Sequence, residues 1–275
     1  VEQANLLAYL GIKEIVLTGV NIGDFGIQNP LSGKRPETFF ELVKELDRQK
    51  SIERFRISSI EPNLLKDEII EFVAQSKRFM PHFHIPLQSG SDTILKRMKR
   101  RYVSTLYTER VAKIKSLMPH CCIGADVITG FPGETEEEFM KTYQFINELD
   151  VSYLHVFTYS ERDHTEAASL DGKVPVQIRQ ERTKMLRILS EKKRQDFYQK
   201  QIGSTRNVLF ENPSSPDYQE GFTDNYIKIK VKQNESLAGV LSTVHLKKLD
   251  GDWLEGELEI ELKPTPADRP TVMLS

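Results

Sequence analysis

Hydrophobic and polar positions follow one pattern up to about residue 203 and another beyond it. Before that point, apolar runs of strand length alternate with segments whose apolar residues recur every three or four positions. The first kind is typical of buried strands and the second of amphipathic helices. Strands are expected at 12–18, 55–60, 82–87, 123–129 and 153–159. Their alternation with helices predicts an α/β fold with a parallel sheet, either a barrel or a doubly wound sheet.

The segment 121–150 is the clearest of these strand–loop–helix units. Its strand is followed by Gly130-Phe131-Pro132-Gly133, a turn with two glycines and a proline. Thr135 and Glu138 then have the spacing of a capping box, which begins a helix. The helix has Phe139, Tyr143 and Ile146 on one face. In parallel α/β folds, ligands bind at the carboxyl ends of the strands, where this loop lies.

Helices are expected at 1–10, 38–48 and 67–75, within the stretch up to Met118, and at 177–201. The last is rich in charge and is predicted to end before Gly203. Its inner face is expected to hold Ile178, Met185, Leu186 and Leu189.

The second pattern, after Gly203, consists of short alternating strands separated by turn residues. Strands are expected at 205–211, 222–231, 237–246 and 253–262. They predict a small all-β barrel of the oligonucleotide-binding type, followed by a loose proline-rich tail beyond Pro264. The expected domains are therefore a (β/α) domain over 1–202 and a β-module over 203–270.

Composition adds constraints on the class of protein. The net charge of −2 over 275 residues gives no global basic character, so nucleic acid would have to bind at a local patch. The chain contains two cysteines, Cys121 and Cys122, which are adjacent and are expected to be core thiols, so a disulfide framework is excluded. No apolar run reaches the length of a membrane span. A cytoplasmic protein with no membrane contact and no obligate protein partner is expected.

Three groups of polar residues are candidates for chemistry. His82 and His84 share one face of a strand, where hydrogen-bonded histidines are favoured over a metal pair because no third ligand is evident. Glu61 and Glu134 end strand–loop units and are either rim residues of a site or ordinary turn residues. The basic run of Lys96, Arg97, Lys99, Arg100 and Arg101 is either a solvated helix flank or a strip that binds RNA phosphates.

Five motifs, in order, resemble one known family. They are TGVNIGDFG (18–26), RISSIEP (56–62), HIPLQSGSDTILKRMKRRY (84–102), DVITGFPGETEEEF (126–139) and FTYSERDHTEAA (157–168). Together they resemble the MiaB-type radical S-adenosylmethionine methylthiotransferases, and GFTDNY (221–226) resembles the RNA-binding TRAM domain of that family. The resemblance implies a partial radical-SAM (β/α) barrel plus a TRAM barrel. It also implies methylthiolation of a hypermodified adenosine beside the anticodon, with the tRNA anticodon stem-loop as partner. The TGVN and YSER spellings resemble the branch that acts on threonylcarbamoyl-adenosine.

The resemblance also assigns the cofactor-binding residues. Thr18, Gly19 and Asn21 are expected at the methionine end of S-adenosylmethionine, and Ser59 and Glu61 near its carboxylate and ribose. Ile128, Gly130, Phe157 and Tyr159 are expected to flank the adenine. Gln88 completes this set of cofactor-binding residues, and no catalytic side chain is assigned.

The chain departs from the family in two ways. Asp163 and His164 stand where many members have Pro and Gly, and the cysteine motif that binds the 4Fe–4S cluster is absent. The missing cysteine motif predicts that this chain is a piece of a radical enzyme, inactive alone, whose cluster ligands lie outside this chain. Two alternatives stay open: a non-catalytic RNA-binding protein that uses the β-module, and an unrelated α/β-barrel enzyme whose glycine loop holds phosphate.

Overall fold

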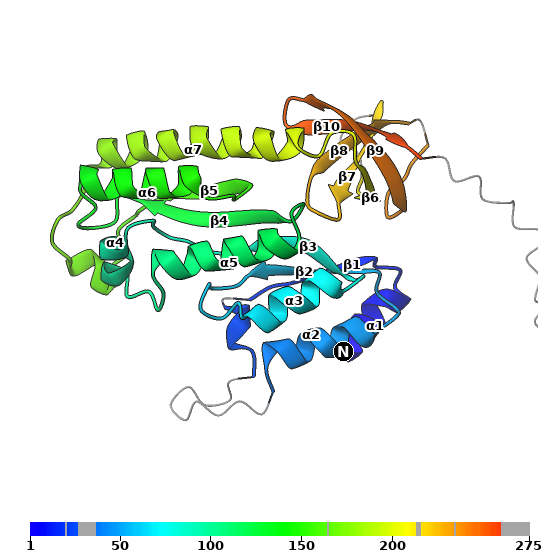
Figure 1. Cartoon of the computed structure of the whole chain (residues 1–275), viewed down its shortest axis with the longest axis horizontal. Coiled ribbons are helices and arrows are strands. Elements are labelled where there is room, and N and C mark those ends of the chain that lie inside the picture. Colours follow the sequence, from blue (N-terminus) through cyan, green and yellow to red (C-terminus); the bar gives the residue numbers. More distant parts are fainter. Residues whose placement is uncertain (20, 27–36, 164, 213–215, 234, 260–275) are drawn as a thin grey trace, which may run out of the picture.

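The computed structural model describes residues 1–19, 21–26, 37–163, 165–212, 216–233 and 235–259. Its first half is built on an open sheet of five parallel strands in the order β1-β2-β3-β4-β5 (Figure 1). The strands are β1 (Glu14–Leu17), β2 (Arg54–Ser59), β3 (Phe79–His84), β4 (Cys122–Thr129) and β5 (Tyr153–Thr158). This sequential parallel order is that of a partial (β/α) barrel and confirms the expected fold class.

Helices connect the strands and cover one face of the sheet. They are α1 (Glu2–Tyr9), α2 (Phe39–Arg48), α3 (Asp67–Gln75), α4 (Asp92–Arg97), α5 (Ser104–Leu117), α6 (Glu136–Glu148) and α7 (Val176–Gln199). Two short 3₁₀ turns, η1 (Ile22–Asp24) and η2 (Glu166–Ser169), lie in loops. Within the described residues, no helix is long and apolar enough to cross a membrane.

β3 begins three residues earlier than expected and ends earlier too. Pro81 has no N–H to donate to a neighbouring strand, and the β2–β3 register shifts on either side of Ile57. Pairing with β4 nevertheless continues beyond His84, since the amides of Ile85 and Leu87 donate to carbonyls of β4.

The capping box expected at the start of α6 is only half formed. Thr135 Oγ1 accepts from the amide of Glu138, as predicted, but the Glu138 carboxylate contacts Ser91 and Lys141 instead of returning to the cap. A complete capping box starts α2, where Thr38 and Glu41 bond reciprocally. A tertiary partner has therefore replaced the local one at α6.

The inner face of α7 differs from the prediction. Leu186 and Leu189 are buried, but Ile178 and Met185 are 37% and 38% exposed, so their expected burial was wrong. The turn that packs against the ends of β4 and β5 contains the polar residues Arg179, Arg182 and Thr183, all buried. Their side chains bond carbonyls, carboxylates and hydroxyls there, so the contact is polar and a hydrophobic pattern could not reveal it.

The β-module is a closed barrel with strand order β10-β8-β7-β6-β9. Its strands are β6 (Thr205–Phe210), β7 (Tyr218–Thr223), β8 (Lys228–Lys232), β9 (Leu241–Asp250) and β10 (Trp253–Leu258). The strand expected at 222–231 is thus wrong: it is the end of β7, a turn and β8, because Tyr226 takes a left-handed φ of 66° that breaks the strand. The strand expected at 237–246 begins at Leu241, because residues up to Val240 form a turn.

Three of the expectations are not tested by the structure. The tail beyond Pro264 lies outside the described residues, and so does His164. The division into 1–202 and 203–270 stays a prediction.

The two faces of the parallel sheet differ in chemistry. The face toward the helices is apolar and includes Phe55, Phe83, Ile123 and Val127. The opposite face is polar. It has an acid and two arginines on β1 and β2, histidines on β3 and β5, and an acid on β4: Glu14, Arg54, Arg56, His82, His84, Asp126 and His155. A polar concave face is expected where a partial barrel holds a ligand rather than a packed core.

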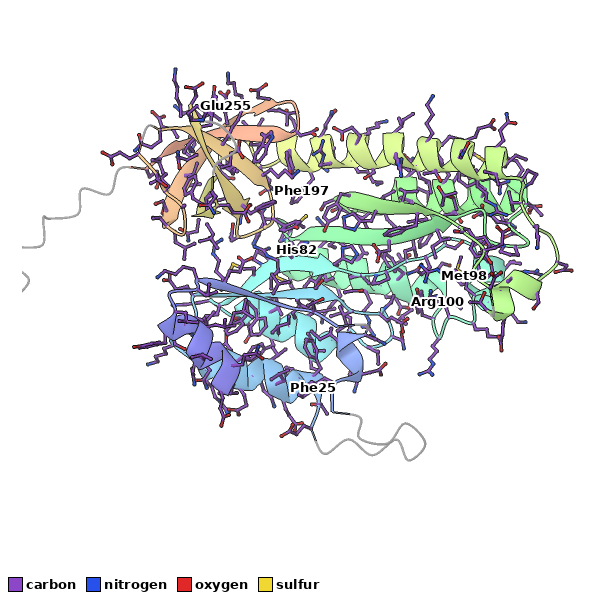
Figure 2. The ribbon with its side chains drawn as sticks, turned by 180° about the vertical axis from the view of Figure 1, so that it is seen from behind. Phe25, His82, Met98, Arg100, Phe197 and Glu255 are labelled. Carbon is purple, nitrogen blue, oxygen red and sulfur yellow. The ribbon has the colours of Figure 1, made fainter. Side chains whose placement is uncertain are left out.

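The β-module covers the amino-terminal end of this polar face. Arg56 pairs with Glu14 at 3.0 Å and donates to the carbonyls of Thr223 and Asp224. Tyr226 stacks on His82 with ring centroids 4.3 Å apart. Figure 2 shows His82 beside the module, whereas Met98 and Arg100 lie at the opposite end of the sheet. The carboxyl ends of the strands are therefore free of the module.

Candidate active site at the carboxyl rim of the sheet

Each strand of the sheet delivers one predicted site residue to the same rim. Asn21, Glu61, Gln88, Gly130 and Tyr159 each follow the end of a different strand. Because all five strands are parallel, these positions occupy one edge of the sheet.

Polar contacts link the first two loops with the segment after α4. Asn21 Nδ2 donates to Asp24 Oδ2 at 2.8 Å and reaches Glu61 Oε2 at 3.5 Å. Arg100 Nη1 donates to Glu61 Oε1 at 3.2 Å. Arg100 was expected in the RNA strip, and its position beside Glu61 depends on the turn that ends α4, where Lys99 has a φ of 56°.

A cavity of about 200 Å³ opens beside this cluster. Arg100, Ile128, Phe131 and Tyr159 are among the residues that line it. Phe131 packs edge-on against Tyr159, with ring centroids 5.2 Å apart. Phe131 was not predicted as a site residue, although it lies inside the glycine turn that pointed to the site. The lining combines apolar and aromatic surface with three cations and one carboxylate, which suits a flat, partly polar ligand.

Several buried polar atoms at this rim have no partner among the described residues. They include Asn21 Oδ1, Arg100 Nε, Glu134 Oε1, Tyr159 Oη and Arg182 Nε. Unpaired buried polar atoms are costly in a folded protein, and Arg100 and Tyr159 both line the cavity, which indicates that a ligand completes these two.

The remaining predicted residues lie around the cavity. Phe157 pairs in register with Ile128 and is 52% exposed on the same face. Gln88 has a φ of 67° and exchanges backbone hydrogen bonds with β4. This left-handed conformation is uncommon outside glycine and is often found at functional sites. Thr18 and Gly19 are exposed, and Ser59 is half-buried.

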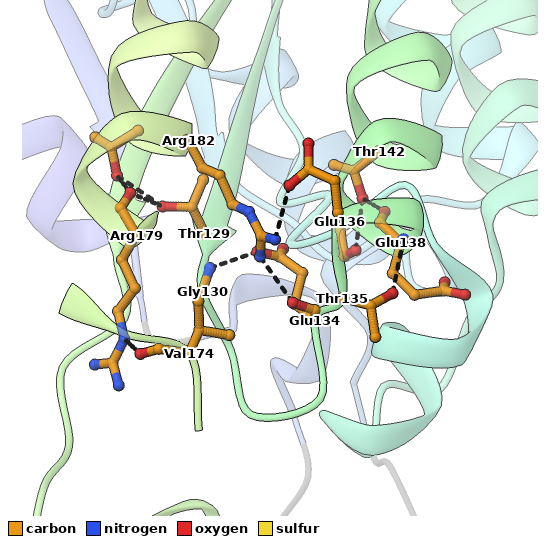
Figure 3. A network of polar contacts seen from close by, with 12 residues as sticks. Thr129, Gly130, Glu134, Thr135, Glu136, Glu138, Thr142, Val174, Arg179 and Arg182 are labelled. Atoms are coloured by element: carbon orange, nitrogen blue, oxygen red, sulfur yellow. Dashed lines mark hydrogen bonds and ion pairs between the residues drawn. The ribbon is translucent and has the colours of Figure 1, made fainter. Parts of the chain in front are cut away.

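Gly130 and Glu134 have structural roles at this rim (Figure 3). A Cβ on Gly130 would lie 2.2 Å from the side chain of Arg179, and the residue has a φ of +75°. Glu134 is buried, accepts from the Gly130 amide at 2.7 Å and pairs with Arg182 at 2.9 Å. Burial raises the pKa of Glu134, and the contacts with Gly130 and Arg182 offset part of that effect. Glu134 therefore anchors the loop to α7 rather than facing the cavity.

The basic run is largely paired within the chain. Arg97 contacts Asp171, Lys99 contacts Glu166 and Arg100 contacts Glu61. No ion pair to a described residue is found for Lys96 and Arg101, which are both exposed. Only these two are therefore free to meet phosphate without breaking an existing ion pair.

The histidines of β3 are hydrogen-bonded, as expected. His82 Nε2 lies 3.1 Å from the Tyr153 hydroxyl, and burial lowers the pKa of His82 well below its usual range. His84 Nε2 lies 2.8 Å from Asp126 Oδ1. Burial alone would raise the pKa of Asp126, but hydrogen bonds from His155 and His84 outweigh it and lower the pKa.

The two cysteines do not fit a 4Fe–4S cluster. Cys121 packs in the core between sheet and helices, whereas Cys122 packs in the core of the β-module. Both are buried and free. A cluster needs three or four convergent thiolates, so this chain cannot hold one with its own cysteines.

Comparison with known proteins agrees with this geometry. A family model described as the radical SAM superfamily matches residues 1–146. Threonylcarbamoyladenosine tRNA methylthiotransferase MtaB of Bacillus subtilis is 38% identical over 94% of this chain and 57% of its own length. The protein of the same name from Rickettsia prowazekii is 40% identical over 84% of this chain and 53% of its own length. The tRNA-2-methylthio-N(6)-dimethylallyladenosine synthase of Wolinella succinogenes is 35% identical over 93% of this chain and 59% of its own length.

The chain belongs to the radical SAM superfamily. It spans somewhat more than half the length of these curated relatives. Solved structures resemble it distantly: the radical S-adenosylmethionine methyltransferase TsrM of Kitasatospora setae gives a TM-score of 0.44 at 15% identity, over 57% of this chain and 29% of that one. Members of the superfamily use S-adenosylmethionine and a 4Fe–4S cluster. The rim cavity with its unpartnered polar atoms fits the first of these, and the cysteines do not fit the second.

Proposed function

We propose that this chain forms the cofactor-binding barrel and RNA-binding module of a tRNA methylthiotransferase. Its substrate would be a hypermodified adenosine beside the anticodon, most closely threonylcarbamoyl-adenosine. The observation that carries the proposal is the rim: residues from five separate motifs meet there, and three of these motifs line a cavity with unpaired polar atoms. Relatives that share 38–40% of this sequence are named for this reaction, which supports the choice of substrate. Such a substrate implies a cytoplasmic enzyme.

In this proposal the rim residues bind and orient S-adenosylmethionine. Ile128 and Tyr159 enclose the adenine, with Phe157 and Gly130 beside it. The loop of Thr18, Gly19 and Asn21 approaches the methionine end. Ser59, Glu61 and Gln88 approach the ribose and the carboxylate. Bound S-adenosylmethionine would supply, on one-electron reduction by the cluster and cleavage of a C–S bond, the radical that removes a hydrogen atom from the base. The side chains hold the cofactor in place and exclude water.

Arg100 refines this assignment. Its guanidinium already pairs with Glu61, and its Nε is an unpaired donor at the cavity. A carboxylate on the ligand would find a better partner in Arg100 than in Glu61, because two carboxylates repel each other. We therefore assign the contact with the methionine carboxylate to Arg100 and the contact with ribose hydroxyls to Glu61.

The test is an anaerobic assay of the whole gene product, reconstituted with iron and sulfide. Transfer RNA bearing threonylcarbamoyl-adenosine and transfer RNA bearing dimethylallyl-adenosine are offered separately, and nucleosides are identified by mass spectrometry. Methylthiolation of the first substrate is expected. Tyr159→Ala should weaken S-adenosylmethionine binding about tenfold or more, because it removes one wall of the cavity. Tyr9→Ala, which alters an 88% exposed tyrosine on α1, should leave binding unchanged.

Methylthiolation of the dimethylallyl substrate alone would move the protein to the other branch of relatives. Absence of any methylthio product, with tRNA still bound, would favour the non-catalytic RNA-binding reading. Equal cofactor affinity in Tyr159→Ala and Tyr9→Ala would exclude the rim cavity as the adenine site.

A further inference from the structure

Three potential metal ligands converge on the polar face of the sheet, below the rim. They are His84 of β3, Asp126 of β4 and His155 of β5, and one ligand atom from each lies within 4.8 Å of the others. His84 Nε2 is 2.8 Å and His155 Nδ1 is 3.4 Å from the same oxygen, Asp126 Oδ1. The rim cavity and the module interface are lined by other residues, except that His155 also borders the interface.

Strand register brings these side chains together. Asp126 pairs directly with His155 on the neighbouring strand, and His84 pairs with Gly124, two residues before Asp126. Residues two apart on a strand face the same side. Gly124 leaves space for the ring of Tyr153, since a Cβ there would lie 2.3 Å from that ring.

Tyr153 orients His84 from behind. Its hydroxyl lies 3.5 Å from His84 Nδ1 and 3.1 Å from His82 Nε2. A contact on Nδ1 directs the other ring nitrogen, Nε2, toward Asp126. Metal-binding histidines usually have such an outer partner, which fixes the ring and the nitrogen that binds.

We propose that His84, Asp126 and His155 bind one divalent transition-metal ion, with Zn²⁺ as the representative. Two imidazoles and one carboxylate form a common ligand set for such ions, with bonds of about 2.0–2.2 Å. Three ligands leave at least one position open. The side chain of His155 is 55% exposed, so the open position can be reached from the polar face of the sheet, where it can take an oxygen or nitrogen of a bound ligand.

This site is distinct from an iron–sulfur cluster. It contains no thiolate, and both cysteines are buried elsewhere. Iron bound here would therefore be a single ion without acid-labile sulfide. Iron found after reconstitution of this chain could therefore be bound at this site. Measuring acid-labile sulfide as well distinguishes a single iron ion from a cluster.

The experiment uses the complete chain after removal of metal with a chelator. Titration with ZnCl₂ in competition with a chromophoric chelator is expected to give one ion per chain. His155→Ala removes a ligand that is half exposed, so the fold is retained, and circular dichroism checks this. Its affinity should fall by more than the 10–100-fold that loss of an outer partner costs. The affinity of Tyr153→Phe for Zn²⁺ should fall by about 10–100-fold.

His245→Ala is the matched control, because it removes a histidine of the β-module that contacts Thr205 and is not one of the three ligands. It should bind Zn²⁺ as the unchanged chain does. With Co²⁺, visible absorption bands should appear in the unchanged chain and in His245→Ala, and be lost in His155→Ala. Absence of stoichiometric Zn²⁺, or equal affinity in His155→Ala and His245→Ala, would leave a hydrogen-bonded cluster without a metal and overturn the proposal.

Discussion

Cys121 and Cys122 are neighbours in the sequence but belong to different cores. Adjacent residues of β4 face opposite sides, so one thiol packs between sheet and helices and the other meets the β-module. Burial raises the pKa of both thiols, that of Cys122 to about 12. The nucleophile in thiol chemistry is the thiolate, so both residues should be inert while the chain is folded.

This gives a prediction about pH. An ordinary thiol with a pKa of about 8.5 becomes much more reactive between pH 7 and 9. In the folded chain neither cysteine should react with a disulfide reagent across that range, because the thiolate is still unpopulated at pH 9. Both should react in urea. Ser51→Cys, at an exposed position, is the positive control. One equivalent of rapid reaction in the unmodified folded chain would contradict the assigned burial.

At the scale of the element, α7 fastens the glycine loop to the sheet. Arg182 donates to the carbonyl and the carboxylate of Glu134, and Glu134 accepts from the amide of Gly130 (Figure 3). Arg179 packs over Gly130 and donates to the carbonyl of Tyr159. The loop and the end of β5 are thus positioned by two arginines of one helix.

Removing one of these arginines should be costly. Arg182→Met leaves the Glu134 carboxylate buried without its partner, and breaking a buried pair in this way costs about 3–5 kcal/mol. Arg48→Met breaks an exposed pair with Glu45 and should cost less than about 1 kcal/mol. Urea denaturation followed by circular dichroism measures both. Similar losses in the two variants would show that the Arg182–Glu134 pair does not anchor the loop.

At the scale of the whole molecule, the β-module and the sheet form one body. Cys122 of β4 and Phe197 and Tyr198 of α7 are part of the module's own apolar core. Asn225, in the turn between β7 and β8, donates to the carbonyl of His120 at 2.9 Å. A cavity of about 340 Å³ remains between module and sheet, bordered by Tyr226 and Lys228. Deleting the module would expose this core, so point substitutions are the better test of its role.

The module's surface offers a cation beside an aromatic ring. Lys228 Nζ lies 5.5 Å from the ring of Trp253, and Lys232 on the same strand is exposed. Single-stranded RNA binds to such combinations by stacking and phosphate contact. Lys228→Ala with Lys232→Ala should weaken tRNA binding and lower the slope of log K against log salt by about 0.7–0.9 per lost contact.

The control removes the same charge from the helical layer, with Lys50→Ala and Lys77→Ala, both exposed. It should leave affinity and salt slope unchanged. A second double variant, Lys96→Ala with Arg101→Ala, tests whether the basic run also contacts RNA. Equal affinities in the module variant and the control would remove the module from the RNA interface.

The sequence by itself determined the parallel α/β order, the change to an all-β module, and the loops that meet at the rim. These features follow from local periodicity, glycine turns and motif order, which are contained in short stretches of chain. Tertiary structure alone decided the partners of Glu138 and Glu134, the polar inner face of α7, the pairing of Arg100 with Glu61, and the grouping of His84 with Asp126 and His155. Each depends on side chains from separate elements whose proximity is set by strand register and helix packing, and no local pattern carries that information.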